Sequence, residues 1–238
     1  MSARGVGPPE ATVGSKWGYT YTAGWRVDAD VNEVKDLSIE TLLRQEAESR
    51  ELLGSRLCLY QIHSATIESG VLADDAVRDE LARLRAGGLY IGFTATGPGQ
   101  RDTIERAVQA GGFDAVQATW NLLDPSAGPA LAAARAAGLG VIVKEAVANG
   151  RLTARGDVPE LLQIADEVGV GPDALALAAV LAQPWVDVVL SGATTDDMLT
   201  SNLAALDVEV SAELLDRLGR LAEDPDVYWE NRSRLAWN

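Results

Sequence analysis

Apolar residues follow two recurring patterns along the chain. Short runs of apolar and β-branched residues predict strands, and longer segments with apolar residues at helical spacing predict helices between them. The strand runs are 11–16, 57–63, 89–95, 115–120, 140–146 and 187–193. The helical segments are 38–54, 74–88, 99–112, 128–138 and 172–184. The first of these begins at Ser38 and ends at Gly54, which are residue types typical of helix caps.

A strand followed by a helix, repeated along the chain, indicates a parallel sheet with right-handed crossovers. We expect a (β/α) barrel rather than a doubly wound nucleotide-binding sheet, because no glycine-rich dinucleotide fingerprint follows the first strands. Barrel enzymes carry their chemistry at the carboxyl ends of the strands. The residues near the predicted strand ends are Lys16, His63, Thr94, Trp120, Glu145 and Ser191. We therefore expect these residues to face one mouth.

Composition and charge narrow the choice of partners. The 238-residue chain is 47% hydrophobic, as expected of a globular protein, and lacks an apolar stretch of about 18 residues that could span a membrane. Its opening, MSARGVGPPE, has no apolar signal core, so we predict a cytoplasmic location. The net charge of −15 argues against nucleic acid or an anionic membrane as a partner. A phosphate would have to be held locally, by amides at a helix N-terminus.

His63 is the only histidine and Cys58 the only cysteine. A histidine at a strand end can be a structural hydrogen bonder or a functional group, and the pattern alone leaves both interpretations open. Lys16 ends another predicted strand and is expected to point to the same opening, which favours the functional interpretation. Cys58 lies inside a strand run and is expected to be a small buried apolar residue.

Several segments in the same order resemble the aldo/keto reductases. They are SKWG, LYQIHS, IGFTATG, VQATWNLLD, GVIVKEAVANGRLT, the stretch from ALALAAVLAQP to TSNLAAL, and the tail YWENRSRLAWN. The resemblance implies a (β/α)8 barrel without a metal. It also implies an oxidoreductase that uses NADP(H) or NAD(H) to reduce aldehydes and ketones, or to oxidise sugar-like alcohols.

The resemblance also implies catalytic roles. In the family a tyrosine donates a proton to the carbonyl oxygen, a lysine paired with an aspartate lowers the pKa of that tyrosine, and a histidine orients the carbonyl. Lys16 and His63 match the lysine and the histidine. These roles agree with the chemistry, since a phenol with a pKa near 10 is a poor acid until a nearby ammonium stabilises its phenolate.

The tyrosine and aspartate of the family lie in a DTAxxYG-type segment that has no match before the lysine strand. We therefore expect residues 1–238 to form a single aldo/keto reductase-like barrel domain that lacks its first two βα units and has about six parallel strands. We also expect impaired activity, and association through exposed barrel edges. Tyr19 and Tyr21 follow Lys16 and are the local candidates for a substitute acid, although loop tyrosines more often face solvent or line a pocket.

At the nicotinamide end of the expected cofactor site, the match to the family is incomplete. Gln117 matches a glutamine that contacts the carboxamide, and Thr94 stands where a serine is usual. Ala95 replaces an asparagine. Lys144 replaces an aromatic residue that stacks on the nicotinamide ring, so stacking is doubtful unless Lys144 turns away or pairs with Glu145.

At the phosphate end the match is also mixed. The positions that resemble pyrophosphate contacts are Val147, Asn149 and Gly150. Ser191 and Gly192 resemble contacts to the 2′-phosphate, and Asn202 resembles a contact to adenine. The stretch 191–202 is expected to open the last helix, whose N-terminal amides suit the 2′-phosphate of NADPH. Gly192 and Met198 stand where many members have basic residues, and Asp196 and Asp197 lie nearby. We expect weak NADPH binding or acceptance of NADH.

The sequence leaves open the roles of two tryptophans and allows two alternatives to the reductase function. Trp17 and Trp120 either form apolar walls of a substrate pocket or simply pack. A non-catalytic barrel that binds a nicotinamide nucleotide or a partner protein is the alternative to an enzyme, and an in-frame DTAxxYG-type segment upstream would favour the enzyme. A metal-dependent hydrolase needs several histidine or carboxylate ligands, so one histidine argues against it.

Overall fold

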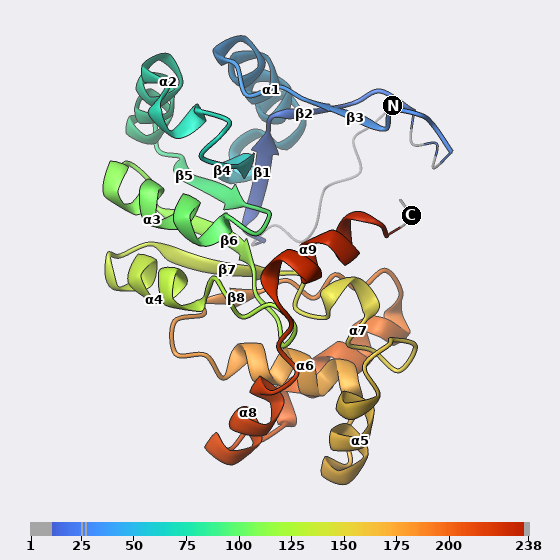
Figure 1. Cartoon of the computed structure of the whole chain (residues 1–238). Coiled ribbons are helices and arrows are strands. Elements are labelled where there is room, and N and C mark those ends of the chain that lie inside the picture. The colour runs from blue at the N-terminus through green and yellow to red at the C-terminus, as the bar shows by residue number, and fades with distance from the viewer. Residues whose placement is uncertain (1–10, 25, 27, 236–238) are drawn as a thin grey trace.

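The structure is a computed structural model that describes residues 11–24, 26 and 28–235. Six parallel strands form a curled half-barrel in the order β1-β4-β5-β6-β7-β8 (Figure 1). They are β1 (Val13–Trp17), β4 (Leu57–Ala65), β5 (Tyr90–Ala95), β6 (Ala115–Thr119), β7 (Gly140–Lys144) and β8 (Val188–Val189). All six predicted strands are therefore confirmed, as is the partial barrel. Within the described residues β1 and β8 are the edges of this sheet.

Helices α1 to α4 cover the outer face of the sheet, and α5 to α8 form a second group beside it (Figure 1). Their bounds are α1 (Ile39–Leu53), α2 (Asp75–Ala86), α3 (Gln100–Ala110), α4 (Gly128–Ala136), α5 (Pro159–Val168), α6 (Pro172–Leu181), α7 (Asp196–Leu203), α8 (Ala212–Gly219) and α9 (Pro225–Ser233). Short 3₁₀ turns lie at Gly54–Arg56, Val71–Ala73, Ala148–Gly150 and Ala204–Asp207. The predicted caps of α1 are confirmed. Ser38 Oγ accepts from Thr41 N at 3.3 Å, and Gly54 takes a positive φ of 57°.

A hairpin and three helices were not predicted. The hairpin pairs β2 (Tyr19–Tyr21) with β3 (Glu33–Lys35) in antiparallel fashion. Its strands are three residues long and mostly polar, so they lack the apolar run that marks a buried strand. The unpredicted helices are α5, α8 and α9.

Alternate residues of each strand face the helices and form the main core. Tyr60 and Ile62 of β4 and Phe93 of β5 are fully buried there, with Leu42 of α1 and Leu131 of α4. Each such aliphatic or aromatic side chain contributes about 1.5–3 kcal/mol by leaving water. Trp17 belongs to this core at 1% exposure. Cys58 is only half-buried, and its Sγ lies 3.3 Å from the Arg56 carbonyl oxygen, so the expectation of a buried cysteine was too strong.

The other residues of the strands face the concave side of the sheet. Gln61 of β4 and Gln117 of β6 are both buried there, and Gln61 Nε2 lies 3.5 Å from Gln117 Oε1. Gly92 of β5 lies between their strands, and a Cβ at this position would come within 3.0 Å of Gln61 Cγ. A side chain at this position would therefore crowd Gln61 and the Ala115 carbonyl oxygen.

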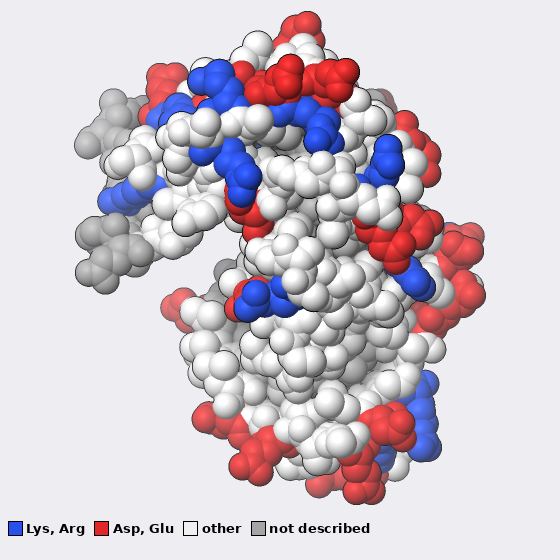
Figure 2. All heavy atoms as spheres, turned by 90° about the vertical axis from the view of Figure 1, so that its left-hand side faces the viewer, with Lys and Arg blue, Asp and Glu red and all other residues white. Residues whose placement is uncertain are grey.

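The surface carries charges of both signs. On the face formed by α2, α3 and α4, acidic and basic side chains lie intermixed around the margin and uncharged residues fill much of the centre (Figure 2). This face therefore has no broad basic area of the kind that binds a phosphate backbone. None of the helices in the described part of the chain is both long and apolar enough to cross a bilayer.

Candidate functional site

The carboxyl ends of β1, β4 and β7 bring Lys16, His63 and Lys144 to one mouth. Lys16 is paired in register with Gln61, two residues before His63, so Lys16 and His63 lie on the same face of neighbouring strands. Burial, and after it the charges of Lys16, Lys144 and Lys35 in that order, together lower the pKa of His63 to about 4. The imidazole is therefore neutral near pH 7, surrounded by three lysines.

The β2–β3 hairpin supplies a second layer to this mouth. The ring of Tyr19 meets the ring of His63 edge to face, with centroids 4.6 Å apart and planes at 61°. Lys35 Nζ donates to the Ser64 carbonyl oxygen at 2.6 Å and lies 6.0 Å from the Tyr19 ring centroid. Lys35 is thus a site residue that the sequence did not reveal, because its hairpin is too short to give a periodic signal. Tyr19, one of the two candidate acids, lies against His63.

Helix α9 lies beside the carboxyl ends of β6 and β7 (Figure 1). Arg232 binds the Glu145 carboxylate through two nitrogens, with Nη2 at 2.6 Å from Oε1 and Nε at 3.1 Å from Oε2. Asn121 Nδ2 donates to Tyr228 Oη at 2.9 Å. Trp229 Nε1 donates to Asp124 Oδ2 at 2.9 Å, and both residues are buried. These contacts fix the helix over the site. They join residues about a hundred positions apart, which no local pattern could have revealed.

Burial and charge set the protonation of the remaining groups. Burial lowers the pKa of Lys144, and Arg232 and Lys16 act in the same direction. Burial works to raise the pKa of Glu145, but hydrogen bonds from Arg232 and the charge of Lys144 bring it below its usual value. Lys16 lies on the edge strand β1, so its side chain is exposed along one side, although burial against neighbouring protein atoms still lowers its pKa.

Backbone strain is concentrated next to these strand ends. Among the described residues, four that are not glycine have positive φ, namely Ser64 at 55°, Glu145 at 57°, Ala148 at 49° and Asn149 at 53°. The first follows His63, and the other three follow Lys144. Such conformations cost about 1–3 kcal/mol each and persist where the surrounding structure enforces them, often at functional sites. Ser64 N donates to Thr94 Oγ1 at 2.6 Å, which helps to hold the first of them.

The positions matched to cofactor contacts fall into two groups. Thr94 and Gln117 are 1% and 5% exposed and are engaged with Ser64 and Gln61. Val147, Asn149 and Gly150 form the turn after β7. Ser191, Gly192 and Asn202 lie together, since Asn202 Nδ2 donates to the Ser191 carbonyl oxygen at 3.0 Å and to its hydroxyl at 2.8 Å.

A hollow of about 300 Å³ opens beside this second group, at the start of α7. Its lining includes Ser191, Gly192, Thr194, Thr195 and Asp196. The lining therefore combines three hydroxyl-bearing residues and one acidic residue with the apolar Ala193 and Leu199.

The two candidate pocket tryptophans are placed differently. Trp17 points to the helices because Lys16, its neighbour in β1, points to the concave face. Trp120 stacks edge to face on Trp185, with centroids 5.6 Å apart. Trp120 also lines a cavity of about 500 Å³ together with Leu122 and Gln183, so packing alone describes Trp17, whereas Trp120 both packs and forms part of a cavity wall. Among the described residues no group of three histidine, cysteine, aspartate or glutamate side chains could hold a metal ion.

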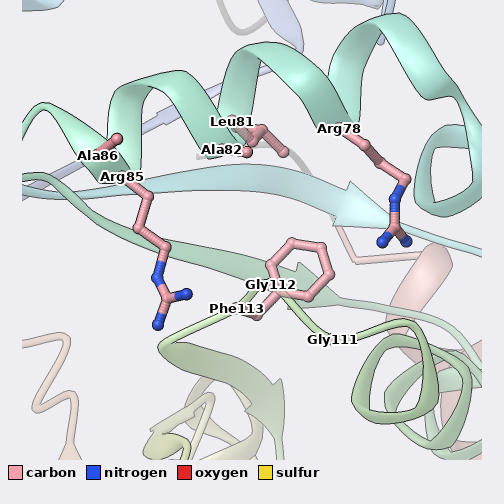
Figure 3. A pocket seen from close by; sticks show the side chains of 8 residues that line it. All are labelled: Arg78, Leu81, Ala82, Arg85, Ala86, Gly111, Gly112 and Phe113. Atoms are coloured by element: carbon pink, nitrogen blue, oxygen red, sulfur yellow. The ribbon is translucent and has the colours of Figure 1, made fainter.

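A larger cavity, of about 500 Å³, lies at the opposite end of the strands, between α2 and the loop before β6 (Figure 3). Arg78 and Arg85 point from α2 to either side of Phe113. Arg78 donates to the carbonyl oxygens of Leu72 and Ala110, and Arg85 binds Asp114 through two nitrogens. Both guanidinium groups are engaged within the protein, so the cavity offers no free cation for chemistry.

Comparison with known proteins gives a consistent family assignment. The profile of the Aldo/keto reductase family matches residues 6–223. The structure resembles the holo form of the aldo-keto reductase AKR11C1 from Bacillus halodurans, with a TM-score of 0.72, 21% identity, and coverage of 90% of this chain and 73% of that one. The structure also resembles the apo form of the same protein, with a TM-score of 0.64, 21% identity, and coverage of 79% of this chain and 70% of that one. No curated protein matches the chain. The likeness to solved structures shows the fold and the profile shows the family: the chain belongs to the aldo/keto reductases, a family of oxidoreductases.

Proposed function

We propose that the mouth around His63 binds the carbonyl group of an aldehyde or ketone, which a nicotinamide nucleotide reduces, or catalyses the reverse oxidation of a sugar-like alcohol. The observation that carries this proposal is the state of His63. Its imidazole is neutral near pH 7, and none of the described residues forms a hydrogen bond to it. A neutral imidazole N–H can donate to a carbonyl oxygen and stabilise the negative charge that develops there.

Lys16 and Tyr19 are the groups that we propose act beside His63. The Lys16 ammonium stabilises negative charge at the mouth, and the phenol in ring contact with His63 belongs to Tyr19. No tyrosine and aspartate pair of the DTAxxYG type is found among the described residues at this mouth. We therefore expect slow turnover, because loss of a positioned general acid typically costs two to four orders of magnitude in rate.

The nucleotide supplies the hydride when it is bound. The residues that hold it in this proposal are Thr94, Gln117, Val147, Asn149, Gly150, Ser191, Gly192 and Asn202. The hollow at the start of α7 fits the adenosine part, since it presents hydroxyl groups and the Gly192 backbone in open space. The nicotinamide end fits less well, because Thr94 and Gln117 already have partners and Lys144 stands in the place of a stacking ring. NAD(H) and NADP(H) are both proposed as ligands.

We further propose a cytoplasmic protein with a small-molecule substrate and without nucleic acid or membrane partners, as its acidity favours. Self-association through the sheet edges is also proposed. Val188 of the edge strand β8 is 46% exposed, and unpaired apolar edges favour pairing with another chain. Light scattering on the purified chain tests this point, and a monomer at all concentrations would contradict it.

The catalytic proposal is tested by product formation from 4-nitrobenzaldehyde with NADPH or NADH, measured by chromatography so that slow turnover is detected. We expect the alcohol to form above the uncatalysed background at less than about 1 s⁻¹. His63→Ala should lower the rate at least tenfold. Arg101→Ala is the matched control, because Arg101 lies on the outer helix α3 and makes an exposed ion pair with Glu105. No alcohol above background with either nucleotide overturns the proposal.

A further inference from the structure

The lysines of this protein all lie near His63. The chain has 20 basic residues, of which 17 are arginine and three are lysine. The three lysines are Lys16, Lys35 and Lys144, and all three are close enough to His63 for their charges to act on it. Apart from the pair between Lys144 and Glu145, arginine supplies the cation in the ion pairs among the described residues.

The two side chains differ in chemistry more than in charge. A guanidinium remains protonated in proteins and does not act as a nucleophile, whereas a buried lysine releases its proton readily and then offers a nucleophilic amine. The basic residues that can release a proton are therefore found only around the mouth that contains His63.

Lys144 has the surroundings of such an amine. Its side chain is 17% exposed at the end of β7, where it lies beside Thr119 of β6. Its Nζ is 3.7 Å from Glu145 Oε1, which is longer than a hydrogen bond, and that carboxylate is already bound by Arg232 through two nitrogens. Arg232 and Lys16 place further positive charge near it. Burial and neighbouring cations are the two features that favour the neutral form of a lysine. The Glu145 carboxylate and the Trp229 ring, whose centroid is 6.0 Å from Nζ, favour the ammonium instead, but burial is the largest influence and the pKa of Lys144 is lowered.

The other two lysines are placed differently. Lys35 is exposed, and its Nζ is held by the Ser64 carbonyl oxygen at 2.6 Å. Lys16 is exposed on the edge strand β1. Water therefore stabilises the charged form of both more than that of Lys144.

We propose that the Lys144 amine forms an imine with carbonyl compounds that enter the mouth. The inference rests on the proposed function in one respect, that aldehydes or ketones reach this site. The neutral amine adds to the carbonyl carbon, a C–N bond forms, and the carbonyl electron pair moves to oxygen, which takes up the proton that the nitrogen releases. A second proton, taken from water, converts the hydroxyl of this carbinolamine into a leaving water molecule. The nitrogen lone pair forms the C=N bond as the C–O bond breaks, and an iminium remains on Lys144. No oxidant or reductant is consumed.

The experiment traps this imine without any nucleotide. The purified chain is incubated with 4-nitrobenzaldehyde and sodium cyanoborohydride at pH 7, digested at acidic residues, and mapped by mass spectrometry, which resolves the three lysines separately. We expect the secondary amine at Lys144 to form at least ten times faster than at Lys35. The matched variants are Lys144→Arg, which should lose the fast adduct, and Lys35→Arg, which should keep it. A rate at Lys144 equal to or below that at Lys35 in the unmodified chain overturns the proposal.

The same aldehyde separates this result from the reductase proposal. A chain that gives the Lys144 adduct but forms no alcohol with NADPH or NADH supports imine formation and contradicts the reductase proposal. A chain that forms the alcohol with His63 dependence but gives no preferential adduct at Lys144 contradicts imine formation and leaves the reductase proposal standing.

Discussion

The Tyr19 ring lies edge to face against the His63 ring, with centroids 4.6 Å apart, and so brings a phenol to the one imidazole of the chain. The contact joins the β2–β3 hairpin to the end of β4. It places an ionisable hydroxyl at the mouth where the resemblance to the aldo/keto reductases calls for a proton donor.

Tyr19→Phe keeps the ring against His63 and removes the proton. If the phenol protonates the substrate oxygen, the rate of alcohol formation from 4-nitrobenzaldehyde should fall about a hundredfold, within the range typical of general-acid loss. Tyr21→Phe is the matched control, because Tyr21 lies on the same hairpin with 45% of its surface exposed, and it should change the rate less than twofold. A Tyr19→Phe rate within threefold of the parent would show that the proton comes from elsewhere.

The low pKa of His63 predicts how stability depends on pH. Folding lowers this pKa from its usual value near 6.5 to about 4. Between these values the unfolded chain binds a proton that the folded chain does not, so stability is complete above about pH 6.5 and falls as the pH decreases toward 4. The loss between pH 7 and pH 5 should be about 2 kcal/mol.

Urea unfolding at pH 5, 6 and 7 measures this term for the parent and for His63→Gln. Because His63 is the only histidine, the variant should lose most of the pH dependence in this window, which lies above the range where most carboxylates titrate. Parallel curves for the two proteins would mean that the imidazole is not desolvated by folding.

The ion pair between Arg232 and Glu145 predicts a local contribution to stability. Glu145 is largely buried, and Arg232 satisfies its carboxylate through two nitrogens. Arg232→Gln should leave that charge with Lys144 alone and lower the free energy of unfolding by about 1–3 kcal/mol, between the effects typical of exposed and buried pairs.

Arg234→Gln is the matched control for this prediction. Arg234 lies just beyond the end of α9 and pairs with Glu230, and both side chains are exposed. Its loss should cost less than about 0.5 kcal/mol in the same urea titration. Equal effects of the two substitutions would show that Arg232 contributes no more than a surface charge.

The strands of the main sheet were predictable because they are short runs rich in apolar residues, as in Leu57–Ala65 and Tyr90–Ala95. The last was predicted over 187–193 but consists of Val188–Val189, because the chain turns away before Gly192, where φ is 65°. Helix α5 carried a readable signal, with Pro159 in its first turn and apolar residues at helical spacing. That signal was overlooked.

The site was predictable only in part. Lys16 and His63 could be placed at one mouth because parallel strands align their carboxyl ends. Strand alternation also contained the answer for Trp17, since a residue next to Lys16 must face the opposite side of the sheet. The contacts of Tyr19, Lys35 and Arg232 depend on tertiary packing of a short hairpin and a terminal helix, which periodicity does not encode.

The start of α7 predicts weak discrimination between the two nucleotides. Asp196 and Asp197 occupy its first turn, and Asp196 lines the hollow proposed for the adenosine part. Carboxylates there favour the helix but repel a 2′-phosphate. We expect the preference for NADPH over NADH to stay below about a hundredfold, or 2.7 kcal/mol, in tryptophan-quenching titrations.

Replacing both carboxylates, Asp196→Ser with Asp197→Ser, should tighten NADPH binding about three- to tenfold and leave NADH nearly unchanged, because only NADPH carries the extra phosphate. Asp207→Ser is the matched control, since it removes an exposed carboxylate from the turn Ala204–Asp207, outside the hollow. The double variant should also melt at a slightly lower temperature, because it removes acidic residues from a helix N-terminus. Equal gains for both nucleotides would place the phosphate away from α7, and a parent preference above a hundredfold would show that backbone amides hold the phosphate despite the two carboxylates.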